Sequence, residues 1–388
     1  MDRIKVYQPQ YFKKFQCIGS DCRETCCQRW DIAIDEETYG KYMSLEEDTR
    51  NGIVKRIIVT GQEPFSAKMS FNDQRRCFFL NNRRLCDIQA RHGHEYLSHT
   101  CRTYPRKYCV VGNEAEAFLS LSCEAAAKVV LFERNIMMFE DCILECEGSM
   151  LFNNTLEADK YAVSGNAIDI FWTLRTVSIL AAQSRHYRFR VRMLILGIYI
   201  KQASELLAEG RHEDIAAHAE KFIERLVTEF YDSLSEQVPG KDNLELQFVL
   251  GLLNDMSARA SLIGDVSLGR FIANACAGMD ISPDGEPLES FADDYNKYYE
   301  MYFADKEYIL ENFVVNHIFS SGFPFNYKFE DSIMKNYREL LVKYNMIKFL
   351  LVGVCRNSMK FDKRKVVECV ASFSRAYDHH RGGALKMK

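Results

Sequence analysis

Cysteine thiols are the residues of this sequence best suited to chemistry, and nine of its 14 cysteines fall in the first third of the chain. They are Cys17, Cys22, Cys26, Cys27, Cys77, Cys86, Cys101, Cys109 and Cys123. In a reducing compartment, such a concentration of thiols indicates metal or redox chemistry rather than disulfides. Thiolate sulfur is a soft donor that suits zinc and iron–sulfur clusters, and each such site takes about four thiolates. Eight of these cysteines can therefore supply two metal sites.

We predict that eight of the nine are metal ligands: Cys17, Cys22, Cys26, Cys27, Cys77, Cys86, Cys101 and Cys123. Because the side chains of adjacent residues diverge, Cys26 and Cys27 either belong to different ligand sets or divide ligand and supporting roles. The later cysteines are dispersed, so a bound metal would tie distant loops together. Cys109 is equally well explained as a buried apolar residue. The alternative for the whole region is a set of ordinary buried thiols.

Aromatic and charged residues near the cysteines could bind a substrate or a cofactor. Trp30 and Asp31 form an aromatic–acid pair able to hold a lysine or a sulfonium ion; alternatively, Trp30 packs on the metal loop and Asp31 caps a turn. Arg106 can position a carboxylate with its paired donors, or the Tyr104–Pro105–Arg106 segment is a turn that orients Cys101. We predict Asp31, Tyr104 and Arg106 as catalytic residues, and Trp30 and Arg102 as cofactor-binding residues.

The elements that must position these residues change character near residue 125. Residues 1–125 are irregular, with short β-capable pieces at 53–60 and 77–80, and form a loop-rich cysteine module. In residues 126–388, apolar residues recur every three or four positions, which predicts an all-α domain. The expected helices cover 124–146, 166–184, 188–208, 212–236, 244–263, 265–277, 290–318, 330–350 and 362–378. The predicted fold class is therefore mainly α.

Charge and hydropathy exclude several classes of protein. The 50 basic and 54 acidic residues give a net charge of −4, so no global charge favours nucleic acid as a partner. Apolar runs such as Met193–Ile200 are far shorter than the roughly 20 residues of a membrane-spanning helix. The charged N-terminus lacks the apolar region of a signal peptide. We expect a cytoplasmic protein that does not bind membranes.

The cysteines and their neighbours together resemble a known family. The pattern Phe15-x-Cys17, Cys22, Cys26-Cys27-x-x-Trp30, Cys77-x-Phe-Leu, Cys86 and Cys101-x-Thr-Tyr-Pro-Arg106 is similar to the cysteine signature of the flagellin lysine-N-methylases. A broader group of small metal-binding cysteine proteins shares that signature. The narrower assignment depends on four later segments: Leu-Ser-Leu-Ser-Cys at 119–123, Glu-Asn-Phe-Val-Val-Asn at 311–316, Phe-Pro-Phe at 323–325, and Ser-Phe-Ser-Arg at 372–375 with His379. The resemblance covers nearly the full chain.

The resemblance implies an enzyme that transfers a methyl group from S-adenosylmethionine to surface lysines of flagellin, the protein of the bacterial flagellum filament. It also implies a 4Fe-4S cluster as cofactor, with zinc as the alternative metal. The sequence departs from two common methylase patterns. No third cysteine follows Cys22-x3-Cys26 at the spacing of the usual radical-type loop, and no Gly-x-Gly loop follows a strand as in nucleotide-binding α/β methyltransferases. The sequence is therefore compatible with methyl transfer by polar displacement and with methyl transfer by radical chemistry.

A competing hypothesis is a non-catalytic scaffold or chaperone, stapled by zinc or an iron–sulfur cluster, that binds flagellar filament subunits. It predicts metal binding without affinity for a methyl donor. The enzyme hypothesis predicts both.

Overall fold

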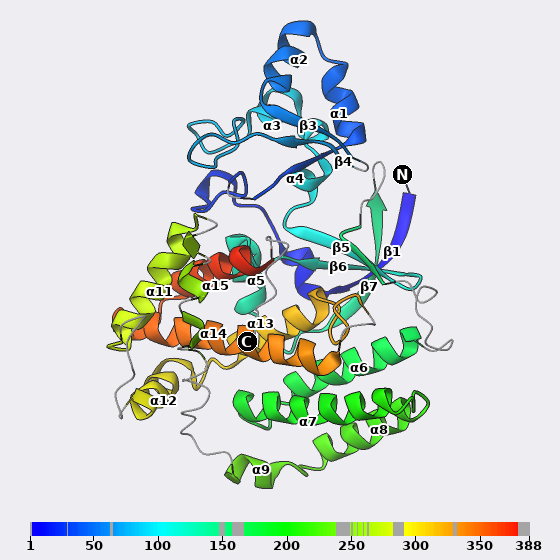
Figure 1. Cartoon of the computed structure of the whole chain (residues 1–388), viewed down its shortest axis with the longest axis vertical. Helices are drawn as coiled ribbons and strands as arrows, with labels where there is room; N and C mark the ends of the chain where they lie inside the picture. Colours follow the sequence, from blue (N-terminus) through cyan, green and yellow to red (C-terminus); the bar gives the residue numbers. More distant parts are fainter. Residues whose placement is uncertain are drawn as a thin grey trace.

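The computed structural model divides into a small upper module and a larger body (Figure 1). It describes residues 2–28, 30–62, 65–146, 152–156, 167–237, 264–281, 291–328 and 332–378, with short stretches between 249 and 261. One hydrophobic core lies within residues 32–97, and a second joins residues 6–15 to residues 108–377. We call residues 27–103 the upper module and the rest of the described chain the body.

The upper module wraps four short helices around a three-stranded antiparallel sheet of order β2–β4–β3. Its elements are β2 (Ala33–Asp35), α1 (Glu36–Met43), α2 (Glu47–Val54), β3 (Ile57–Gln62), β4 (Phe65–Met69), α3 (Asp87–His92) and α4 (His99–Thr103). The carboxylate of Asp35 caps α1 by accepting a hydrogen bond from the Thr38 N–H at 3.0 Å, and it accepts another from the His99 N–H at 2.6 Å. One buried acid therefore fixes the starts of both α1 and α4. Of the two expected β pieces, the first overlaps β3, whereas residues 77–80 form isolated bridges instead of a strand.

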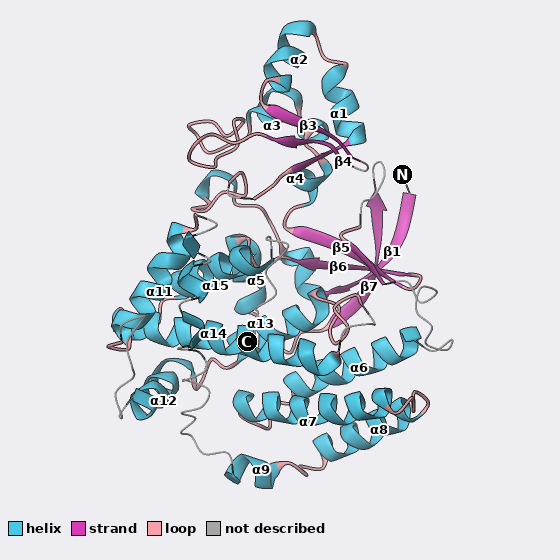
Figure 2. Ribbon diagram, viewed as in Figure 1, coloured by secondary structure: helices cyan, strands magenta, loops and turns pink. Residues whose placement is uncertain are grey.

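A five-stranded sheet of order β7–β1–β6–β5–β8 lies on the right-hand side of the body, below the upper module (Figure 2). Its strands are β1 (Asp2–Pro9), β5 (Arg106–Val111), β6 (Glu114–Leu119), β7 (Phe139–Cys146) and β8 (Asn154–Leu156). Strand β1 runs parallel to β6 and antiparallel to β7, while β5 runs antiparallel to β6 and parallel to β8. The sheet therefore combines strands from both sides of residue 125.

The expectation of a helix over 124–146, and of an all-α chain after residue 125, is wrong in this region. Helix α5 (Glu124–Leu131) ends early, and residues 139–146 form β7. Along β7, Cys142 and Leu144 are partly buried while Asp141, Ile143 and Glu145 are exposed, which is the two-residue period of a strand. Exposed ion pairs Lys5–Asp141 and Arg3–Glu145, both 3.1 Å, match this register across to β1.

The remaining body is helical, in agreement with the mainly α prediction. It comprises α6 (Ala167–Ala182), α7 (Phe189–Ala208), α8 (Asp214–Val227), α9 (Asp232–Gln237), α11 (Val266–Gly278), α12 (Phe291–Phe303), α13 (Tyr308–Ser320), α14 (Ile333–Asn357) and α15 (Lys363–Asp378). Helix α14 crosses the body and packs against α7, α11, α12, α13 and α15. Its contact with α11 is very close, because a Cβ atom on Gly353 would lie 2.6 Å from the Ala275 carbonyl oxygen. Glycine is required there by the approach of two backbones.

Five expected helices are confirmed by α6, α7, α11, α14 and α15. The ranges 212–236 and 290–318 each contain two helices instead of one, and Glu229, with φ 57°, interrupts the first of them. The range 244–263 and His379 lie largely or wholly outside the described residues. Within the described part of the chain, no helix combines the length and apolarity needed to cross a bilayer.

Candidate functional site

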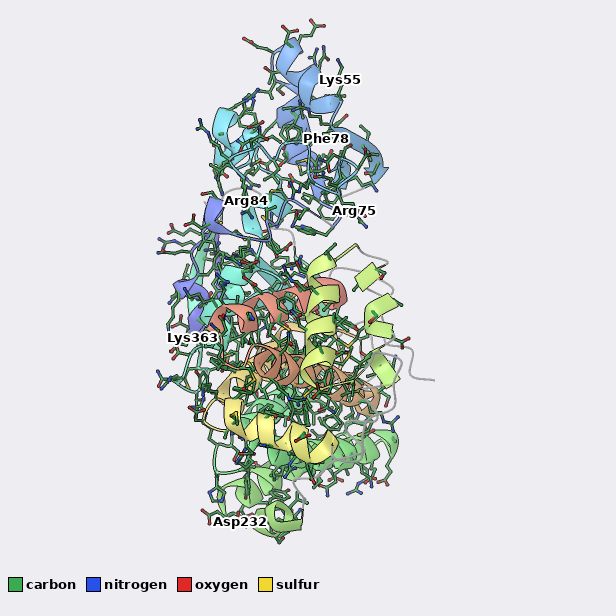
Figure 3. The ribbon with its side chains drawn as sticks, turned by 90° about the vertical axis from the view of Figure 1, so that its left-hand side faces the viewer. Lys55, Arg75, Phe78, Arg84, Asp232 and Lys363 are labelled. Atoms are coloured by element: carbon green, nitrogen blue, oxygen red, sulfur yellow. The ribbon has the colours of Figure 1, made fainter. Side chains whose placement is uncertain are left out.

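Two turns with the same hydrogen-bond pattern present Cys77 and Cys86. In the first, the Asn72 Oδ1 accepts bonds from the N–H groups of Gln74 and Arg76, each at 3.0 Å. In the second, the Asn81 Oδ1 does the same for residues 83 and 85, at 2.9 and 3.1 Å. The fourth residue of each turn is left-handed: Arg75 has φ 56° and Arg84 has φ 61°. Figure 3 shows both arginines at the end of the upper module that faces the body.

This nine-residue structural repeat is not evident from the sequence, because only Asn, Arg and Cys recur at matching positions. The available sequence signal is an asparagine five residues before each cysteine, since Asn side chains commonly accept backbone hydrogen bonds in turns. The repeat explains how a loop-rich segment holds two cysteines in fixed places.

Cys27 and Cys101 complete what we call the module group: Cys27, Cys77, Cys86 and Cys101. The Cys77 N–H donates to the Cys27 carbonyl at 2.8 Å. The Ser98 Oγ caps α4 by accepting from the Cys101 N–H at 3.2 Å. Burial raises the pKa of Cys77 to about 12 and also raises the pKa values of Cys86 and Cys101, and the neighbouring thiols of the group raise all three further.

The other four predicted ligands, Cys17, Cys22, Cys26 and Cys123, form what we call the junction group, where the loop over residues 16–27 meets the body. Burial raises the pKa of Cys22 to about 12, and nearby Glu124, Cys123 and Cys17 raise it further. A hydrogen bond between the Cys26 and Cys27 thiols raises the pKa of Cys26 and lowers that of Cys27 to about 7. Cys26 thus belongs to the junction group and Cys27 to the module group, with their two thiols in contact. They connect the two groups.

Each group offers four sulfur donors, which is the ligand set of an iron–sulfur cluster or of a closed zinc site. Among the described residues, no three cysteine sulfurs lie within 4.8 Å of one another. Tetrahedral zinc with Zn–S bonds of about 2.3 Å requires sulfurs about 3.8 Å apart. A cubane cluster is larger and separates its thiolates more widely. Cys109 belongs to neither group, because it lies fully buried in β5 within the core of the body.

Trp30 and Tyr104 lie together against the junction group, with ring centroids 5.3 Å apart. The Trp30 Nε1–H donates to the Cys26 carbonyl at 2.6 Å. The Tyr104 hydroxyl shares a hydrogen bond with the Ser122 Oγ at 3.0 Å. Burial, followed by the nearby Cys123 thiol, raises the pKa of Tyr104, so the phenol stays neutral at ordinary pH.

The other three predicted site residues have different surroundings. Asp31 is exposed, and Arg102 is half-buried beside Cys101 in α4. The Arg106 guanidinium lies 4.7 Å from the centre of the Phe15 ring, and its Nη2 donates to the Phe15 carbonyl at 3.4 Å. Arg106 thus holds the segment that leads into the cysteine loop. The catalytic roles of Asp31, Tyr104 and Arg106 and the cofactor-binding roles of Trp30 and Arg102 stay predictions.

The cysteine loop is fastened to the body by acidic side chains. The Glu124 carboxylate, at the start of α5, accepts bonds from the N–H groups of Arg23 and Glu24 at 3.4 and 3.2 Å. The Glu24 carboxylate accepts a bond from the Ser267 hydroxyl on α11 at 2.7 Å, and Arg23 pairs with Glu368 on α15 at 3.2 Å. Three helices of the body therefore position the junction group.

Two segments far apart in sequence, 119–123 and 372–375, meet beside Tyr104. Arg375 donates to the Ser122 carbonyl at 3.2 Å and to the Ser372 hydroxyl at 2.8 Å. The Ser122 hydroxyl, already bonded to Tyr104, lies 2.7 Å from the Ser120 hydroxyl. A continuous line of hydroxyls thus leads from Tyr104 to Ser120.

Ser120 lines a partly open cavity of about 190 Å³ between the sheet and helices α13, α14 and α15. The segments 119–123, 311–316 and 372–375 all contribute to its wall. Its other polar residues include His317, Ser321, Lys343 and Asp378. Sequence reasoning missed these four, because they come from separate helices and follow no motif spacing.

Comparisons with known proteins identify relatives of this chain. Residues 175–386 match the model of the FliB lysine N-methylase C-terminal domain. A lysine-N-methylase of Salmonella typhimurium is 30% identical over 149 residues, and one of Salmonella choleraesuis is 29% identical over 149 residues; each match covers 36% of this chain and 36% of the relative. The flagellar biosynthetic protein FliU of Salmonella muenchen is 30% identical over 145 residues, which are 35% of this chain and 83% of FliU. No solved structure matches.

The fold and the site define a mainly α-helical protein with a cysteine-rich module fastened to its helical body. The chain belongs to the FliB lysine N-methylase family, because the family model matches more than half of its residues. The matched segment spans about a third of the length of the two lysine-N-methylases.

Proposed function

We propose that this protein is an S-adenosylmethionine-dependent lysine N-methyltransferase that acts on flagellin and holds a 4Fe-4S cluster on its cysteines. The observation that carries the proposal is the convergence of the segments 119–123 and 372–375 on the Trp30–Tyr104 pair, beside the junction group. Family membership supports the reaction, and the flagellar name of the relative FliU supports the protein substrate.

In this proposal the module and junction groups would hold the metal. A 4Fe-4S cluster held by all four thiols of a group would be structural, whereas one held by only three of them would keep an open iron site able to bind the amino and carboxylate groups of the methyl donor. Burial and then the neighbouring thiols raise the pKa values of these cysteines, so they stay protonated in the absence of a cation, and a bound metal would stabilise their thiolates.

The residues of the chain itself would orient the donor and exclude water. The aromatic faces of Trp30 and Tyr104 suit a sulfonium ion, which is attracted to the negative face of an aromatic ring. Because lysine methylation by displacement needs only a neutral amine in line with the methyl group, positioning and proton removal are the main tasks.

The test is a methyl-transfer assay on protein purified without oxygen. Flagellin is incubated with the full chain and S-adenosylmethionine carrying an isotopically labelled methyl group, and lysine methylation is mapped by peptide mass spectrometry. We expect labelled lysines with the wild type and with Cys109→Ser, and none with Cys26→Ser. Donor binding is measured in parallel by calorimetry.

Wild-type protein that contains iron but neither binds the donor nor labels flagellin would contradict the proposal. That outcome would instead support the non-catalytic scaffold hypothesis. If the Cys26→Ser variant labels flagellin as well as the wild type does, the methyltransferase activity would be supported and a role of the cluster in that activity would be contradicted.

A further inference from the structure

The cavity beside the sheet contains a titratable side chain that the proposed function has not used. His317 lies on α13, and no hydrogen bond to its ring is found within the described residues. Burial lowers the pKa of His317 well below its usual value, and the nearby Lys343 ammonium lowers it further. A neutral imidazole with available nitrogen atoms therefore lines the cavity.

The rest of the wall is suited to an aliphatic chain that ends in a polar group. Phe118, Phe313 and Phe373 supply apolar surface. The Ser321 hydroxyl is buried without a hydrogen-bond partner among the described residues, and it also lines the cavity. Because buried polar groups in folded proteins are nearly always paired, this hydroxyl points to a polar ligand or water at the site.

The charges around the cavity disfavour a further cation. Lys343 on α14 lies 3.8 Å from Asp378 on α15, and Lys107 on β5 adds another positive charge to the wall. Two cations therefore face one anion. A primary amine that enters this environment has its pKa lowered, which favours the neutral form that can attack a methyl group.

We propose that this cavity receives the side chain of the substrate lysine. His317 then accepts the proton that the lysine ammonium must lose before methyl transfer. The inference rests on the proposed function and names the acceptor site within it. The N–H bond of the ammonium breaks and its proton moves to a ring nitrogen of His317. The freed electron pair forms the new N–CH3 bond while the S–CH3 bond of S-adenosylmethionine breaks and its electrons stay on sulfur. The imidazolium then returns its proton to solvent.

The size and position of the cavity favour lysine over the methyl donor. Its volume of about 190 Å³ is below the ~300–1,000 Å³ of pockets that enclose drug-sized ligands. It suits one amino-acid side chain. The segment 119–123 forms part of the cavity wall through Ser120 and ends at Cys123 of the junction group. A substrate lysine in the cavity and a methyl donor held by the junction group would therefore be neighbours.

The first test compares His317→Ala with the matched exposed control His186→Ala, using the full anaerobic chain and flagellin. General-base removal is expected to lower kcat by about 10²- to 10⁴-fold, with little change in donor affinity by calorimetry. Added imidazole should restore part of the rate in His317→Ala and leave His186→Ala unchanged. A structural role for His317 would not give rescue.

The pH profile gives a second readout. Because the pKa of His317 is lowered, with Lys343, Asp378 and Lys107 as the charged groups facing it, the wild-type rate should persist below pH 6.5. In His317→Ala, the rate should instead fall about tenfold for each unit of pH below the pKa of the amine. Equal profiles would overturn the assignment of His317.

Occupancy is tested separately with Nα-acetyl-lysine amide as a probe in calorimetry. Ser374→Phe, which fills the cavity from α15, should abolish probe binding and methyl transfer while iron content and donor binding persist. Unchanged methyl transfer in both His317→Ala and Ser374→Phe would overturn this inference and leave the proposed function standing. A wild type that binds the probe but transfers no methyl group would support the cavity as an amine site and overturn the proposed function.

Discussion

Arg175 and Glu116 form a fully buried ion pair that joins the sheet to the helices. The Arg175 Nη1 donates to the Glu116 Oε2 at 2.9 Å, a second bond runs from Nη2 to Oε1, and the two side chains are 2% and 0% exposed. The guanidinium also lies 4.3 Å from the centre of the Trp172 ring. Strand β6 and helix α6 are thereby fixed to each other in one register.

Replacing Arg175 by Met should destabilise the protein strongly, since Glu116 would be left as an uncompensated buried charge. We expect a loss of about 3–5 kcal/mol in the free energy of unfolding, measured by urea denaturation. The matched control is Arg3→Met, which breaks the exposed Arg3–Glu145 pair and should cost less than about 1 kcal/mol. Equal losses for the two variants would show that burial does not set the strength of the pair.

The contact between α11 and α14 predicts opposite effects for two glycines. Gly353→Ala would place a methyl group 2.6 Å from the Ala275 carbonyl oxygen, and we expect destabilisation by about 1–3 kcal/mol as the helices separate. Gly269→Ala meets no atom within 4 Å on the same helix pair, so it should be neutral or stabilising by up to about 1 kcal/mol. Thermal unfolding of both variants checks the prediction, which fails if Gly353→Ala is tolerated.

The metal content of two cysteine variants tests the division into groups. If each group holds one cluster, Cys101→Ser should remove about half of the iron and sulfide per chain by emptying the module group. Cys109→Ser, equally internal but placed in β5, should leave both contents unchanged. Complete loss of iron from Cys101→Ser would indicate that the groups are not independent, which the Cys26–Cys27 contact allows.

The buried Asp35 predicts a loss of stability in acid. Burial by itself raises its pKa, but hydrogen bonds from the His99 N–H and from Thr38 outweigh burial, and the net pKa lies below its usual value. A depressed pKa contributes stability that is present above the unfolded value of about 3.9 and is lost as pH falls through the folded value. Urea unfolding at pH 7 and pH 3 should show this loss in the wild type and a smaller one in Asp35→Asn. The exposed control Asp73→Asn should behave as the wild type does.

Helices with strong apolar periodicity could be predicted from sequence, whereas β7 could not. In α14 and α15 the apolar residues recur at helical spacing and the helices form as expected. In residues 139–146 the helical and strand periods compete, and pairing with β1, at least 130 residues away in the sequence, decides the outcome. Local pattern carries no information about that partner.

Candidate donor residues could be proposed from the sequence, but the arrangement of the site could not. The eight thiols were proposed because cysteines cluster in sequence, Trp30 because the chain has only two tryptophans, and Tyr104 because it follows Cys101 closely. The cavity was missed because Ser120, His317 and Lys343 approach each other through tertiary packing alone.

The pairing of β1 has a consequence for folding during synthesis. The first strand of the chain completes its pairing only with β7 and β6, so residues 2–9 stay without most partners until residue 146 has left the ribosome. The upper module, in contrast, has its whole core within residues 32–97 and all four thiols of the module group once residue 101 has emerged. The module can therefore fold first, as local contacts form sooner than distant ones. The nascent chain would then have a complete module group of cysteines while strand β1 is still mostly unpaired.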